Sequence, residues 1–137
     1  MKRIILSAAI AAVTLISSQA KVVRNYASQS DNTLTFQVDS VDYRPDLTRV
    51  YGKLIGRPHT SGRIDNIQLL GSGTVSGATD IDGVDFKRYF QWEDDGMIPI
   101  EIDFPALKTL KEAKLLFDTA HGQSTTVMTV SAAKKRK

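Results

Sequence analysis

Apolar residues occupy every second position over much of this chain, and this alternation restricts what it can fold into. Residues 98–104 place Ile or Phe at every second position, and residues 34–38 and 50–56 show the same period with apolar or small side chains. A period of two is that of β-strands with one buried face. With turn residues about every ten positions, the pattern predicts an all-β, antiparallel sandwich of about seven or eight strands over residues 33–130. A closed barrel is the alternative, because alternation does not report whether sheet edges meet.

Residues 84–92 and 98–104 are the clearest strand candidates. They flank Asp95-Gly96, a dipeptide typical of tight hairpin turns because both residues tolerate positive φ. We therefore expect these two strands to pair with each other in an antiparallel hairpin. One face of this pair is expected to supply six core side chains, which are Phe86, Phe90, Trp92, Ile100, Ile102 and Phe104.

One short helix is expected to connect two strands of the sandwich. Pro105 suits a first helical position, and residues 106–113 are mostly good helix formers. The segment is too short for a crossover between parallel strands, so it fits a connection between the two sheets. Two last strands are expected at 114–118 and 124–130, with a turn at His121-Gly122 between them.

The first twenty residues predict export. Met1-Lys2-Arg3 supplies positive charge, residues 4–16 are an apolar run, and Ser18-Gln19-Ala20 is a small-x-small cleavage site, which are the three parts of a signal peptide. A buried amino-terminal helix is the alternative. The run is shorter than the roughly 20 apolar residues of a membrane anchor. We expect cleavage after Ala20, a flexible leader at 21–32, no membrane span, and a periplasmic or extracellular location.

Cysteine and charge counts narrow the environment and the partners. The chain has no cysteine, which excludes disulfides and lipid anchoring through cysteine and points to a bacterial envelope. Residues 31–133 hold ten Lys/Arg against fifteen Asp/Glu. This acidic body argues against nucleic acid as a partner, because such binders present positive charge on a folded face. The segment 131–137 is expected to be a disordered basic tail that contacts anionic surfaces weakly through Lys134, Lys135, Arg136 and Lys137.

Several turn and core positions between residues 34 and 118 form a familiar order. They are Val38-x-x-Val41, Thr48-Arg49-Val50-Tyr51, Pro58, Arg63-Ile64, Asp82-Gly83-Val84-x-Phe86-Lys87, Phe104-Pro105-x-Leu107 and Leu115-x-Phe117. Through these positions the chain resembles secreted bacterial immunoglobulin-like domains of unknown function, which occur alone or ahead of thioredoxin-like domains. The resemblance implies an immunoglobulin-like sandwich and brings no catalytic residues. No Cys-x-x-Cys is present, so a redox role has no residues to perform it.

The segment Asp80-Ile81-Asp82-Gly83-Val84-Asp85 is the strongest candidate for a metal site. Calcium prefers six to eight oxygen ligands, and an acidic loop with a glycine can supply them. Asp80, Asp82 and Asp85 are therefore the candidate calcium ligands, although their spacing is not that of an EF-hand. The alternative is an ordinary surface turn with acidic flanks. A second acidic turn follows at 93–95.

The remaining polar motifs do not indicate catalysis. His59 and His121 have no Ser, Asp or Glu at a catalytic spacing, so they are expected to be structural or solvated. The glycines at 71–77 lack the lysine of a phosphate-binding loop. We therefore expect a non-enzymatic exported accessory or adhesion module that binds a protein or glycan at the cell envelope. The alternative is a small-ligand or calcium-binding carrier, with no other cofactor.

Overall fold

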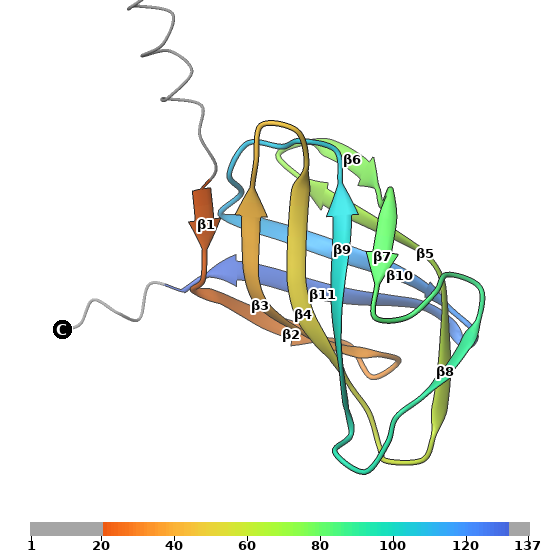
Figure 1. Cartoon of the computed structure of the whole chain (residues 1–137). Helices are drawn as coiled ribbons and strands as arrows, with labels where there is room; N and C mark the ends of the chain where they lie inside the picture. Colours follow the sequence, from red (N-terminus) through yellow and green to blue (C-terminus); the bar gives the residue numbers. More distant parts are fainter. Residues whose placement is uncertain (1–20, 132–137) are drawn as a thin grey trace, which may run out of the picture.

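The computed structural model describes residues 21–131, which form two antiparallel β-sheets packed face to face (Figure 1). No helix occurs in this part of the chain. In Figure 1 the strands of one sheet run across those of the other. The eleven strands are β1 Lys21–Val23, β2 Tyr26–Ser30, β3 Thr35–Tyr43, β4 Thr48–Ile55, β5 Ser61–Gly71, β6 Thr74–Gly77, β7 Asp80–Asp82, β8 Tyr89–Gln91, β9 Met97–Phe104, β10 Glu112–Thr119 and β11 Gly122–Val130.

Each sheet has a simple order. Sheet I runs β1-β3-β4-β9-β7, and sheet II runs β2-β11-β10-β5-β6, with β8 paired to the start of β5. The sheets are linked at one side by the step from β1 to β2 and at the other by the step from β6 to β7. The predicted all-β, antiparallel class is therefore confirmed, and the two sheets give the described residues a sandwich-like architecture.

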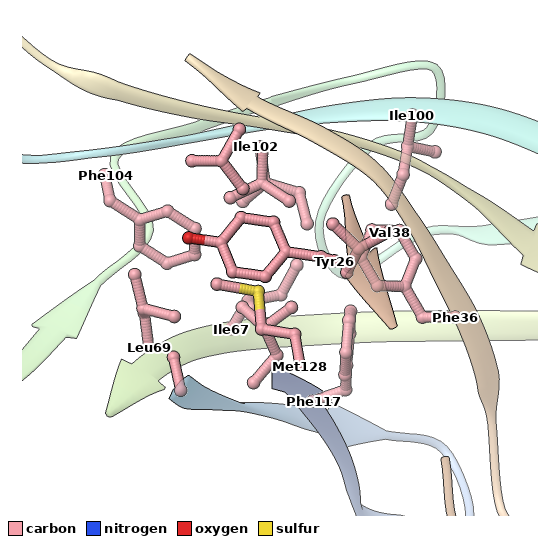
Figure 2. Close-up of a cluster of buried hydrophobic side chains, with 14 of the residues drawn as sticks. Tyr26, Phe36, Val38, Ile67, Leu69, Ile100, Ile102, Phe104, Phe117 and Met128 are labelled. Carbon is pink, nitrogen blue, oxygen red and sulfur yellow. The ribbon is translucent and has the colours of Figure 1, made fainter. Parts of the chain in front are cut away.

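The core lies between the sheets and follows the predicted alternation. In β4, buried and half-buried residues alternate without a break, and β9 buries Ile100, Ile102 and Phe104. The rings of Phe36 and Phe117 meet from opposite sheets with centroids 5.4 Å apart. Figure 2 shows this cluster of apolar side chains, with the Tyr26 ring among them.

The expected immunoglobulin order of strands is not present. Among the described residues, seven strands have five or more residues, and they can be lettered A to G in chain order as β2, β3, β4, β5, β9, β10 and β11. Sheet I then contains B, C and E, while sheet II contains A, G, F and D. An immunoglobulin domain places A, B, E and D in one sheet and C, F and G in the other. The difference arises because β3 and β4 stay in one sheet as a hairpin.

The expected hairpin between residues 84–92 and 98–104 is wrong. Strand β8 pairs with β5, and β9 pairs with β4 and β7. The Asp95-Gly96 turn does form, since Gly96 has a φ of +66° and donates to the Glu93 carbonyl at 3.1 Å. Gly96 also accepts from Gly56, which directs the turn toward the end of β4.

The core prediction for these strands is confirmed for four of its six side chains. Trp92, Ile100, Ile102 and Phe104 are buried, whereas Phe86 and Phe90 are half-buried and pack against the edge of the core. Lys87 adopts a positive φ and donates its backbone N–H to Ile64, which breaks the period of two before β8.

The expected helix at 106–113 is also wrong. Its backbone groups bond to side chains from the strands instead of to one another. The Leu107 N–H donates to Thr48 Oγ1 at 3.0 Å, and the Leu110 N–H donates to the Tyr43 hydroxyl at 3.2 Å. Helix propensity is a weak preference that such tertiary contacts override. The segment crosses from sheet I to sheet II without regular secondary structure and enters β10 at Glu112.

The expected leader at 21–32 is folded over most of its length. Strands β1 and β2 place it in both sheets, one strand in each. Its polar residues are used, because Ser30 Oγ accepts from the Phe36 N–H at 3.0 Å and Ser28 Oγ accepts from the Val38 N–H at 2.8 Å. These two N–H groups lie on the side of β3 that β1 leaves uncovered. Serine side chains thus replace a neighbouring strand at this corner.

Both ends of the described chain lie on the same side of the molecule, and β11 ends beside the step from β1 to β2 (Figure 1). Ser131, expected to belong to a disordered tail, donates its N–H to the Asn25 carbonyl at 2.6 Å and accepts from the Asn25 amide at 3.1 Å. The expected signal peptide at 1–20 and the basic residues 134–137 lie outside the described residues.

Candidate functional site

A polar cavity lies at one end of the sandwich. It has a volume of about 480 Å³, within the range of small-molecule sites. Three connections form it: the β2–β3 loop, the β4–β5 loop and the β10–β11 turn. We call this cavity the end cleft. Its lining consists of Asn32, Thr33, Leu34, Thr35, Ile55, Gly56, Arg57, Thr60, Ser61, Gly62, Arg63, Trp92, Thr119 and His121.

The β2–β3 wall of the end cleft is held by Asp31. One carboxylate oxygen accepts from the Thr33 N–H at 3.0 Å and from the Ser124 hydroxyl at 2.6 Å, and the other accepts from the Thr125 N–H at 2.8 Å. The first of these bonds closes an Asx turn, which is why aspartate suits this position. The Ser124 hydroxyl, followed by the backbone donors, lowers the pKa of Asp31. The loop is thereby tied to β11.

The floor of the end cleft is Trp92 set against two glycines. A Cβ atom at Gly56 would lie 2.4 Å from the indole ring, and one at Gly62 would lie 3.3 Å from it. The Trp92 indole N–H donates to the Leu54 carbonyl at 3.0 Å, and the Phe90 ring meets the indole edge-on. The ring therefore has one fixed position, which depends on the absence of a side chain at Gly56.

The β4–β5 rim is a tight turn. The Arg57 carbonyl accepts from the backbone N–H and from the hydroxyl of Thr60. The backbone N–H of Trp92 donates to the Thr60 carbonyl. His59 has a φ of +69°, donates its backbone N–H to the Trp92 carbonyl, and places Nε2 2.9 Å from a carboxylate oxygen of Asp94. The rim is thus braced by the segment that follows β8.

The lining of the end cleft includes Arg57 and Arg63 and contains no Asp or Glu, although Asp31 and Asp65 bond directly to lining residues. Arg63 is occupied, because its Nε and Nη2 donate to the two oxygens of Asp65 at 2.7 and 3.0 Å and its Nη1 donates to the Tyr89 hydroxyl. The bond to Asp65 raises the pKa of Arg63 and lowers that of Asp65. Arg57 is exposed and forms no ion pair with any residue in 21–131.

The candidate calcium ligands lie elsewhere, at the edge of sheet I. Asp80 and Asp82 are on β7, and Asp85 is exposed in the loop that follows. Asp80 pairs in register with Asp103, and Asp82 pairs with Glu101. Across residues 21–131 no group of three or more His, Asp or Glu side chains is gathered closely enough to hold a metal ion. The three aspartates are therefore not brought into one coordination set.

An arginine occupies the centre of that acidic edge. Arg49 donates from Nε and Nη2 to the two oxygens of Asp103 at 2.7 and 3.0 Å, and its Nε lies 4.0 Å from a Glu101 oxygen. The bond to Asp103, followed by that to Tyr51, raises the pKa of Arg49. This arrangement explains how a strand pairing that places acidic residues opposite one another is tolerated.

The remaining polar positions considered from the sequence lie in turns. His121 is in the two-residue turn between β10 and β11, where its N–H donates to Thr119 Oγ1 at 3.1 Å. Ser72-Gly73 forms the β5–β6 turn with positive φ at both residues. Sequence reasoning missed the end cleft, because its loops are far apart in the chain. The only local signal was the pair of glycines that flank the 57–61 turn.

Comparison of the chain with protein-family models, with curated proteins and with solved structures finds no match. Among residues 21–131 no helix could cross a membrane. Within the described residues, the end cleft is the feature that bears most directly on function.

Proposed function

We propose that this protein is a non-enzymatic, exported binding module that holds a glycan of the cell envelope in the end cleft. The observation that supports it is the composition of the lining. Hydroxyl or amide groups come from Asn32, Thr33, Thr35 and Ser61, and also from Thr60 and Thr119, whose hydroxyls bond within their turns as well. Trp92, which is 6 % exposed, supplies a small aromatic surface at the floor. Saccharides present many hydroxyl groups on a partly apolar ring, and such a lining can satisfy both.

The support for a glycan over a protein partner lies in the shape of the site. The end cleft is concave and its floor is closely packed, as expected of small-ligand sites. Protein interfaces of stable complexes cover about 800 Å² on each partner and have an apolar centre. The hydroxyl-rich lining of the end cleft fits a short saccharide better than such a centre.

Filling the end cleft tests the proposal. Thr35 is an exposed residue of the lining, and Gln37 is exposed two positions further along β3 but outside the lining. Thr35→Tyr should abolish binding to an envelope glycan array, whereas Gln37→Tyr should leave it unchanged. Binding that persists in Thr35→Tyr, or no binding by the wild-type protein across the array, would contradict the proposal.

Export is the second part of the proposal, and it rests on the segment 1–20. Intact-mass analysis of protein recovered from outside the cytoplasm should show a mature chain beginning at Lys21. A protein that retains Met1 would contradict export without bearing on the end cleft.

A further inference from the structure

We infer that the ligand of the end cleft is an anionic saccharide, a short glycan with a sugar carboxylate that is bound by Arg57. This inference rests on the proposed function and adds the chemical class of the glycan. It starts from a difference in charge between the end cleft and the rest of the body.

All fifteen carboxylate side chains of the chain lie between Asp31 and Asp118, and the described residues carry twelve Lys/Arg, so the described body has a net charge of −3 (12 minus 15). None of the fifteen lines the end cleft, and the two that bond to its lining, Asp31 and Asp65, are engaged by hydrogen-bond donors of the protein. An anionic ligand therefore meets no carboxylate side chain inside the cleft, and the repulsion that such a side chain would cause is avoided.

The two arginines of the lining differ in whether they already bind a carboxylate. Arg63 Nε and Nη2 both donate to Asp65, so this side chain is a fixed part of the wall. Arg57 makes no ion pair within the described part of the chain, and only its backbone carbonyl is used by the β4–β5 turn. Its guanidinium is therefore the cationic group available to a ligand.

The chemistry of Arg57 fits a carboxylate. A guanidinium offers planar, paired N–H donors that match the two oxygens of a carboxylate, and such charge-assisted bonds are stronger than neutral ones. The hydroxyls of Thr35 and Ser61 can meet the ring hydroxyls of the same ligand. A long polyanion such as nucleic acid fits poorly, because the acidic body outside the cleft would repel it.

A matched pair of saccharides tests the inference on the full exported chain. One is a galacturonic acid trimer, and the other is the same trimer with its carboxyl groups methyl-esterified and therefore neutral. Trp92 is the only tryptophan of the chain and lines the end cleft, so its fluorescence reports occupancy. We expect the acidic trimer to bind about tenfold or more tightly than the neutral one at low salt, with the difference falling as salt is added.

Two variants separate the inference from the proposed function. Arg57→Gln should remove the preference for the acidic trimer, whereas Arg88→Gln, an exposed arginine outside the lining, should keep it. Equal binding of both trimers, with both lost in Thr35→Tyr, would overturn the anionic ligand and leave the glycan proposal standing. Failure of both trimers and of every glycan on the array would overturn both. Competition by inorganic phosphate as effective as that by the acidic trimer would overturn the saccharide part.

Discussion

The hydroxyl groups of Tyr26 and Tyr43 lie 2.5 Å apart, and they come from opposite sheets. The Tyr26 hydroxyl donates to the Leu110 carbonyl at 2.5 Å, so Tyr43 must donate to Tyr26 and accept from the Leu110 N–H. The three residues form a closed, buried ring of hydrogen bonds. This ring fixes the connection at 105–111 to both sheets.

Removal of one hydroxyl from this ring should destabilise the fold. Tyr26→Phe leaves the Leu110 carbonyl and the Tyr43 hydroxyl without their buried partner, which typically costs about 1–3 kcal/mol. Urea unfolding measures this change. Tyr89→Phe is the control, because Tyr89 is 65 % exposed and should change stability by less than about 0.5 kcal/mol. Equal effects of the two substitutions would contradict the role assigned to the ring.

The same tyrosine should make stability sensitive to alkaline pH. Burial, with the bond to Tyr43, raises the pKa of Tyr26 far above its ordinary value of 10.0. A raised pKa means that the folded state holds the proton more tightly, so the stabilisation is complete below pH 10 and is lost as the pH rises above it. The stability advantage of the wild type over Tyr26→Phe should therefore shrink between pH 9 and pH 11 in urea unfolding. A constant difference would show that the hydroxyl ionises equally in both states.

The contribution of Asp31 to the stability of the fold should change at acidic pH. Its pKa is lowered in the folded state, so its contribution is present above the ordinary value of 3.8 and is lost as the pH falls below it. Because the carboxylate is exposed, screening keeps the effect small, about 1 kcal/mol at pH 7.

Urea unfolding at pH 7 and pH 2.5 tests the contribution of Asp31. Asp31→Asn should be less stable than the wild type at pH 7 and nearly equal to it at pH 2.5. Asp85→Asn, at an exposed aspartate outside the turn, is the control and should match the wild type at both values. A difference between Asp31→Asn and the wild type that does not depend on pH would contradict the assignment.

Gly56 should be intolerant of a side chain. A Cβ atom there would overlap the Trp92 ring, so Gly56→Ala should cost about 1–3 kcal/mol and shift the fluorescence of Trp92. Gly77→Ala is the matched control, since a Cβ atom at Gly77 meets nothing within 4 Å and its φ is not positive. A fluorescence spectrum unchanged in Gly56→Ala would mean that the floor of the end cleft adjusts freely.

The strands could be predicted where local pattern and burial agree. The alternation in β4 and β9 identified the faces that enter the core, because each strand has a single buried side. The partners of β9 could not be predicted, since Asp95-Gly96 forms a turn whether or not its flanks pair with each other. The helix prediction failed because the Tyr43 hydroxyl, distant in sequence, takes the Leu110 N–H that a helix would use.

The candidate site was less accessible to sequence reasoning than the strands. Asp80, Asp82 and Asp85 are close in the chain, but the pairing of β7 with β9 places Asp103 beside Asp80 and Glu101 beside Asp82. Arg49 of the same sheet binds Asp103. The residues of the end cleft, by contrast, are distant in the chain and close together in the fold. They come from loops that only the pairing of distant strands brings together, so no local spacing indicates them.

The hydroxyls of Ser28 and Ser30 have a consequence for the protein at high concentration. They accept hydrogen bonds from two N–H groups of β3 that could otherwise donate to a strand of another molecule. An open strand edge is a template for intermolecular pairing and, in repeated form, for fibrils. Two serines therefore block this corner against self-association without the length of chain that a covering strand would require.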